Sequence, residues 1–133
     1  MSAIPYLNDT DWSVSHMNRV PRVTNRFRQL LPLGVGLSMA SLGELWEGVH
    51  FSRDPDRSRS LLNEFLMAAT LVPIFQRICE RFGYLRGLFR KTGASPGDVD
   101  LLIAATALEH DLTLLSNNRK HFANVTGLRF ESI

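Results

Sequence analysis

The sequence predicts an α/β fold in which helices cover both faces of a parallel sheet. Short apolar, partly β-branched runs alternate along the chain with longer segments of helical periodicity. This alternation favours parallel strands, because each helix carries the chain back to the start of the next strand. With 133 residues, 44% of them hydrophobic and 21% charged, residues 1–133 have the length and composition of one structured domain.

The first half of the chain begins with a strand and then alternates. The first apolar run follows Pro5, whose missing backbone donor is tolerated at the start of a strand. Asp54 and Pro55 are residue types that suit a helix N-cap and the first helical position. The predicted elements of this half are strands at 6–8, 35–38 and 70–73, and helices at 20–31, 41–51 and from 55 onward.

The second half contains the clearest helical pattern. Apolar residues recur at spacings of three and four over residues 74–91, and charged residues fill most remaining positions. A break at 92–97 precedes a largely apolar helix that Asp98 and Asp100 open. The other predicted elements are a strand at 113–116, a turn at Asn117 and Asn118, a helical turn near His121 and a strand at 128–130.

The composition indicates a polyanionic partner and a reducing environment. Thirteen of the fifteen basic residues are arginines, whose planar guanidinium suits phosphate, although arginine is also an ordinary residue of helix surfaces. The single cysteine, Cys79, excludes an intrachain disulfide and is expected to pack on the apolar stripe of its helix. We find neither a membrane-span pattern nor a signal-peptide pattern, so we expect a cytoplasmic protein with no membrane partner.

Polar side chains follow or flank several of the predicted strands. They are Asp9 after the first strand, Glu44 in the helix after the second, Asp98 and Asp100 before the fourth, and Asn118 after the fourth. Ligands of open α/β sheets bind beyond the carboxyl ends of the strands. We therefore expect several of these side chains to converge at that edge of the sheet.

Each acidic position also has a purely structural interpretation. Ser41 and Glu44 have the spacing of a capping box, and Asp9 with Thr10 has the composition of a turn. Asp98 has the place of an N-cap, and the aspartate two residues later would favour the helix dipole. Taken one at a time, these acids need no functional explanation.

Taken together, the acids predict a metal site. Three or four carboxylates at one edge would raise each other's pKa unless a cation neutralised them. An oxygen-only donor set suits Mg²⁺ or Mn²⁺ better than zinc. Because Mg²⁺ completes its shell with water and substrate phosphate, the site indicates phosphoryl chemistry. The histidines show no ligand spacing and are interpreted as surface or turn residues: His16, His50, His110 and His121.

Three segments of the chain carry a resemblance to a known family. They are YLNDTDW, SMASLGELWEGV and GDVDLLIAATALEHDLTLLSNNRKHFANVTGLRFE. In order and spacing they resemble the conserved blocks of PIN-domain ribonucleases, specifically the VapC-type toxins of prokaryotic toxin–antitoxin pairs. The resemblance implies that Asp9, Glu44 and Asp100 bind the metal and that Asp98 is an accessory acid. Asn118 stands where many PIN domains carry aspartate, and the lost charge disfavours a second tightly held metal.

The resemblance also implies an architecture, partners and a reaction. The expected fold is a PIN-like domain with a central parallel sheet of four to five strands, and the expected partners are a second copy of the chain and a cognate antitoxin. The implied reaction is hydrolysis of RNA by a metal-activated water, and many relatives attack tRNA or ribosomal RNA. We expect Ser116 and Asn118 to position the water or the phosphate, and Arg119 and Lys120 to bind the RNA backbone.

Two other functions remain open at this point. If the acids serve only as caps, the chain is a catalytically weak PIN-like module that binds RNA or an antitoxin, and Asn118 keeps this interpretation open. A phosphoacceptor receiver domain shares the sheet and the acids, but it needs a lysine after a late strand, and Lys120 is poorly placed. Metal-dependent cleavage of RNA separates the enzyme from the binding module.

Overall fold

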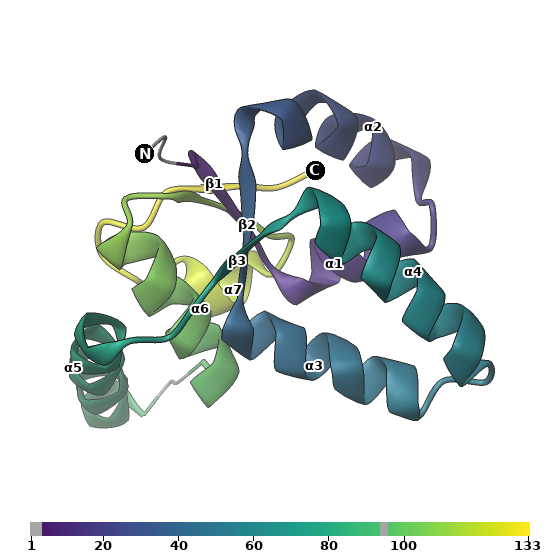
Figure 1. Ribbon diagram of the computed structural model, residues 1–133. Coiled ribbons are helices and arrows are strands. Elements are labelled where there is room, and N and C mark those ends of the chain that lie inside the picture. Colours follow the sequence, from purple (N-terminus) through teal and green to yellow (C-terminus); the bar gives the residue numbers. More distant parts are fainter. Residues whose placement is uncertain (1–3, 94–95) are drawn as a thin grey trace.

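Five short strands form the centre of the fold in a computed structural model, which describes residues 4–93 and 96–133 (Figure 1). Their order across the sheet is β3-β2-β1-β4-β5, and all neighbouring pairs are parallel. The strands are β1 (Tyr6–Asn8), β2 (Val35–Ser38), β3 (Thr70–Val72), β4 (Thr113–Leu115) and β5 (Phe130–Glu131). Since β1 is central, the residues that follow β1 and its two neighbours leave the sheet side by side.

Helices cover both faces of this sheet, as the sequence predicts. Helices α1 to α4 pack on one face and α5 to α7 on the other (Figure 1). A single 3-10 turn (Leu31–Leu33) leads into β2 within the described residues. The α-helices are α1 (Thr10–Met17), α2 (Pro21–Leu30), α3 (Met39–His50), α4 (Pro55–Ala68), α5 (Gln76–Thr92), α6 (Asp98–Glu109) and α7 (Arg119–Phe122).

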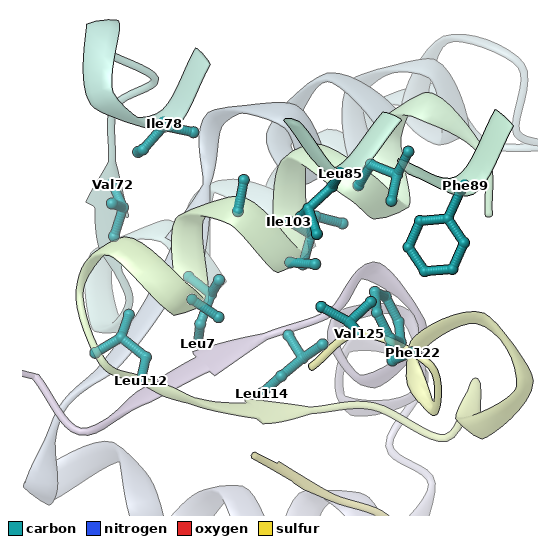
Figure 2. Packing of buried hydrophobic residues seen from close by; sticks show 14 residues of the cluster. Leu7, Val72, Ile78, Leu85, Phe89, Ile103, Leu112, Leu114, Phe122 and Val125 are labelled. Atoms are coloured by element: carbon teal, nitrogen blue, oxygen red, sulfur yellow. The ribbon is translucent and has the colours of Figure 1, made fainter. Parts of the chain in front are cut away.

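Each face of the sheet has its own hydrophobic core. Figure 2 shows the core under α5, α6 and α7, where Leu7 and Leu114 of the strands pack with Ile103 and Phe122. Leu115, the next residue along β4, belongs to the second core with apolar side chains of α1 to α4. Successive strand residues point to opposite faces, and burial of both faces of the inner strands β1, β2 and β4 explains why these strands do not alternate between apolar and charged residues.

Helix starts differ from the sequence prediction at two places that matter for the site. The turn expected at Asp9 and Thr10 is instead the start of α1, with Asp9 as its N-cap. The helix after β2 begins at Met39, not at residue 41, because Ser38 caps it through the backbone N–H of Ala40. Both starts lie directly at the carboxyl end of a strand, so the first turns of α1 and α3 face the same edge of the sheet.

Smaller differences lie away from this edge. The last strand is found at Phe130–Glu131 and not at 128–130, because the backbone N–H of Leu128 forms a turn with Val125. Cys79 is exposed, so the expected packing of its side chain is wrong. Within the predicted break at 92–97, residues 94–95 lie outside the described residues. None of the described helices is both long and apolar enough to cross a bilayer.

Candidate active site

The carboxyl ends of β1 and β4 bring two predicted site residues into contact. Asn8 and Leu115 are partners in the register of the sheet, so Asp9 and Ser116 leave adjacent strands side by side. The backbone N–H of Asp9 donates to the carbonyl of Leu115 at 2.9 Å. The hydroxyl of Ser116 donates to Asp9 Oδ2 at 2.7 Å. The parallel register alone therefore places this serine on this carboxylate.

Asp9 is a buried carboxylate with incomplete charge compensation. It is 2% exposed, and its Oδ1 accepts a hydrogen bond of 2.8 Å from the backbone N–H of Thr10. Burial raises the pKa of Asp9 from 3.8 to about 6. The hydrogen bond from Ser116 opposes this rise, whereas the charges of Asp11 and Asp100 add to it. A cation at this position would favour the ionised form of Asp9.

Asp11 is a further acid of the site that the sequence pattern did not single out. Its Oδ1 accepts from the backbone N–H of Trp12 at 2.7 Å, and its Oδ2 accepts from that of Asn117 at 2.9 Å. Burial raises the pKa of Asp11, and the charge of Asp100 raises it as well. The sequence signal that could have identified Asp11 is its spacing from Asp9, because both acids lie at the start of α1.

Glu44 is linked to this group through Thr10. The hydroxyl of Thr10 donates to Glu44 Oε1 at 2.6 Å, which joins the second turn of α3 to the first residue of α1. The capping box expected from Ser41 and Glu44 does not form, because Ser38 is the N-cap of α3. Glu44 is therefore an exposed acid at the rim of the site, free of the capping role.

Asp100 contacts a histidine from the segment after β4. His121 Nδ1 lies 2.6 Å from Asp100 Oδ2, with 18% of the Asp100 side chain and 49% of the His121 side chain exposed. Asp100 lies in the first turn of α6, and His121 lies in the single turn of α7. His121 is an exposed residue of a helical turn, as interpreted from the sequence, and α7 in addition brings its ring against Asp100 of α6.

Asp98 and Asn118 take part less directly. Gly97 is the N-cap of α6, so the prediction that Asp98 caps this helix is wrong. Asp98 instead forms a 2.9 Å ion pair with Arg86 and is largely exposed. Asn118 joins the site through its backbone N–H, which donates to the hydroxyl of Ser116 at 3.0 Å. Its side chain makes no capping hydrogen bond, although Asn118 is the N-cap of α7.

Two cationic residues come directly after Asn118 in the chain. Arg119 and Lys120 are exposed at the start of α7. The guanidinium of Arg119 lies 5.9 Å from the centre of the Phe130 ring. Among the residues that the structure describes, neither cation forms an ion pair. Their charges are therefore available to an anionic ligand beside the acids.

The donors of this site fit a hard divalent cation. Asp9, Asp11, Asp100 and Glu44 offer carboxylate oxygens. The charges of Asp11 and Asp100 add to the effect of burial on the pKa of Asp9. Across residues 4–93 and 96–133, no three acidic, histidine or cysteine side chains form a ready-made metal cage. Magnesium does not require such a cage, because it commonly binds one or two carboxylates and keeps water or phosphate as its other ligands.

Comparison with known proteins identifies the family. The PIN domain model matches residues 16–128. The chain is 30% identical over 129 residues to Ribonuclease VapC2 of Rickettsia felis, covering 96% of each chain. It is 29% identical over 130 residues to Ribonuclease VapC2 of Haemophilus influenzae, covering 97% of this chain and 98% of the relative.

A solved structure shows the same arrangement of helices and strands. The crystal structure of VapBC2 from Rickettsia felis bound to a promoter DNA fragment superimposes with a TM-score of 0.90 at 28% identity. The superposition covers 96% of this chain and 98% of that chain. The chain therefore belongs to the PIN-domain family and, within it, to the VapC ribonucleases.

Proposed function

We propose that this chain is a divalent-metal-dependent endoribonuclease and the toxin of a toxin–antitoxin pair. The observation that carries the proposal is the gathering of Asp9, Asp11 and Asp100, whose charges act on one another. The charges of Asp11 and Asp100 raise the pKa of Asp9, and the charge of Asp100 also raises the pKa of Asp11, so a cation beside these acids would stabilise their ionised forms. The names of the Rickettsia and Haemophilus relatives support RNA as the substrate.

Asp9 and Asp100 would hold the cation, and Glu44 would bind it directly or through water. A bound Mg²⁺ or Mn²⁺ ion supplies a Lewis acid that lowers the pKa of water and offsets charge on a phosphate. The protein prepares its ligands by hydrogen bonding: the hydroxyl of Ser116 holds Asp9, and that of Thr10 holds Glu44. Each held oxygen keeps a further lone pair, because a carboxylate oxygen accepts more than one bond.

Asp9 has to lose its proton before it can bind a cation. With a pKa of about 6, its carboxylate form predominates at neutral pH and is lost in mild acid. We expect the rate of RNA cleavage to fall as the pH drops through this value. A higher Mg²⁺ concentration should move the midpoint to lower pH, because the cation competes with the proton for the same oxygens. Single-turnover rates at several metal concentrations measure this shift.

Neutral and cationic groups next to the acids would bind the substrate. We assign Ser116 and Asn118 to positioning the attacking water or the scissile phosphate by neutral hydrogen bonds. Arg119 and Lys120 would bind neighbouring phosphates, which fix the position of the RNA without reading its sequence. In-line attack by water would leave a 5′-phosphate and a 3′-hydroxyl. Structured RNAs such as tRNA or ribosomal RNA are the substrates to test first.

The protein partners that we propose are inferred from the family to which the chain belongs. The Rickettsia structure is a VapBC complex bound to promoter DNA, and we propose that this chain has a cognate antitoxin of its own. We also propose that the chain forms a homodimer and acts in the cytoplasm. The proposed domain spans residues 1–133.

The test is cleavage of a mixed RNA pool by the purified protein. Reactions contain Mg²⁺, Mn²⁺ or EDTA, and an Asp100→Asn variant is assayed beside the wild type. Cleavage that needs the metal and Asp100, with 5′-phosphate products, is the expected result. RNA binding without turnover in both proteins would instead favour the RNA-binding module, and it would show that the acids are not catalytic.

A further inference from the structure

The segment after β4 has three residues that each contact one aspartate of the site. The hydroxyl of its first residue donates to Asp9 at 2.7 Å, and the backbone N–H of its second residue donates to Asp11 at 2.9 Å. At the other end of the segment, His121 Nδ1 lies 2.6 Å from Asp100 Oδ2. Residues 116–121 therefore serve as a brace that fixes the carboxylates of the site.

His121 is the residue of this brace that fixes Asp100. Among the described residues, Asp100 has no other hydrogen-bond or ion-pair partner. The turn that carries His121 is packed against the core, because the adjacent Phe122 is 1% exposed and lies in the core (Figure 2). The backbone N–H of His121 also donates to the carbonyl of Asn118 at 3.0 Å. The turn of α7 thus presents the imidazole to one oxygen of Asp100.

We propose that His121 is a positioning residue, whose Nδ1–H donates to Asp100 Oδ2 and orients Asp100 Oδ1 toward the cation. The inference rests on the proposed function, because it names how that site is kept in shape. A carboxylate oxygen at 2.6 Å from a ring nitrogen needs a donor there, so the imidazole carries hydrogen on Nδ1. Hydrogen bonds from outside the ligand shell orient a metal ligand and increase its affinity.

The structure favours His121 over its neighbours in this role. Asn118 occupies the position where the family commonly has an acid, but only its backbone N–H bonds within the site, to Ser116. Arg119 contacts the ring of Phe130, away from the aspartates. His121 alone in the described part of this segment places a side-chain nitrogen against Asp100.

The experiment compares three histidine substitutions. His121→Leu removes the donor, and His121→Asn keeps one, because the asparagine amide nitrogen is as many bonds from the backbone as Nδ1. His110→Leu is the matched control, since this exposed histidine lies at the opposite end of α6. Mn²⁺ binding is measured by electron paramagnetic resonance, kcat and KM are measured on RNA, and thermal melting confirms that each variant is folded.

We expect His121→Leu to weaken Mn²⁺ binding about 10-fold to 100-fold and to lower kcat with little change in KM for RNA. His121→Asn should recover most of both losses, and His110→Leu should match the wild type. A folded His121→Leu variant with wild-type Mn²⁺ affinity would overturn the inference while leaving the nuclease proposal intact, provided that the wild type cleaves RNA.

Two further outcomes also decide against the inference. If His121→Leu fails to fold, His121→Asn is judged alone, and a folded Asn variant that loses Mn²⁺ binding 10-fold or more contradicts a role that only needs a donor. A wild-type protein that neither binds Mn²⁺ nor cleaves RNA would overturn the proposed function and this inference together.

Discussion

Replacing Asp9 by asparagine is expected to stabilise the folded protein at neutral pH while it abolishes cleavage. Asparagine is as good an N-cap as aspartate, so the hydrogen bond to the N–H of Thr10 is kept. Its amide can also donate to the hydroxyl of Ser116, which donates to Asp9 in the wild type. The substitution therefore removes a buried charge and leaves the local geometry in place.

The size of the effect follows from the pKa of Asp9. The unfolded chain releases this proton near 3.8 and the folded chain releases it near 6, so burial of the charge disfavours folding above that range. The contribution of Asp9 to stability is most favourable below pH 3.8 and is lost as the pH rises through about 6. At about 1.4 kcal/mol per pKa unit, the loss at pH 7 is about 3 kcal/mol, and the asparagine variant should escape it.

Urea unfolding at pH 7 and at pH 4 measures this difference. The variant should be more stable than the wild type at pH 7, by as much as about 3 kcal/mol, and the advantage should shrink near pH 4. Millimolar Mg²⁺ should stabilise the wild type more than the variant, since the variant lacks the Asp9 charge and keeps only the other acids of the site. No gain at pH 7, or an equal gain at both pH values, would refute the reasoning.

Three other substitutions test separate parts of the structure. Thr10→Val removes the 2.6 Å hydrogen bond to Glu44 and should lower the cleavage rate about 10-fold with an unchanged melting temperature; a wild-type rate would exclude a role for this bond. Arg26→Met breaks the ion pair with Glu131 that ties α2 to β5, so urea unfolding at low salt should show a loss of about 1 kcal/mol. Gly36→Ala puts a Cβ 2.5 Å from Ile4 Cδ1 and 3.0 Å from Cγ2 of the buried Val72, so it should cost about 1–3 kcal/mol by the same assay, whereas equal stability would contradict this packing.

Apolar periodicity was sufficient to predict most of the fold. The five strands and six of the seven helices in the described residues fall at or near their predicted places, because most of them have a buried face that appears in the sequence pattern. Helix α1 lacks that pattern, since its buried residues are Trp12 and Ser13, one aromatic and one polar. Strand β5 is displaced because it pairs with one neighbour only and its two residues are half-buried. A strand of two residues is too short to show the alternation of buried and exposed side chains that would fix its register.

The site was predictable where it depends on strand ends and unpredictable where it depends on packing. Asp9 is in the site because it follows β1, and that position is readable from the chain. The contact of His121 with Asp100 depends on how Phe122 seats α7 in the core, and no spacing along the chain records that orientation. Asp98 looked equivalent to Asp100, but a helix turns the two side chains apart, and Asp98 pairs with Arg86.

The rate of Mg²⁺-dependent RNA cleavage by matched aspartate variants is the most direct test of the metal-dependent nuclease site. Asp100→Asn removes a carboxylate of the site, whereas Asp111→Asn makes the same change in an exposed aspartate that pairs with Arg129 beyond the far end of α6. We expect cleavage by Asp111→Asn at the wild-type rate and none above background by Asp100→Asn or by any protein in EDTA. Wild-type cleavage by a folded Asp100→Asn variant, or cleavage that persists in EDTA, would contradict a metal site built on these acids.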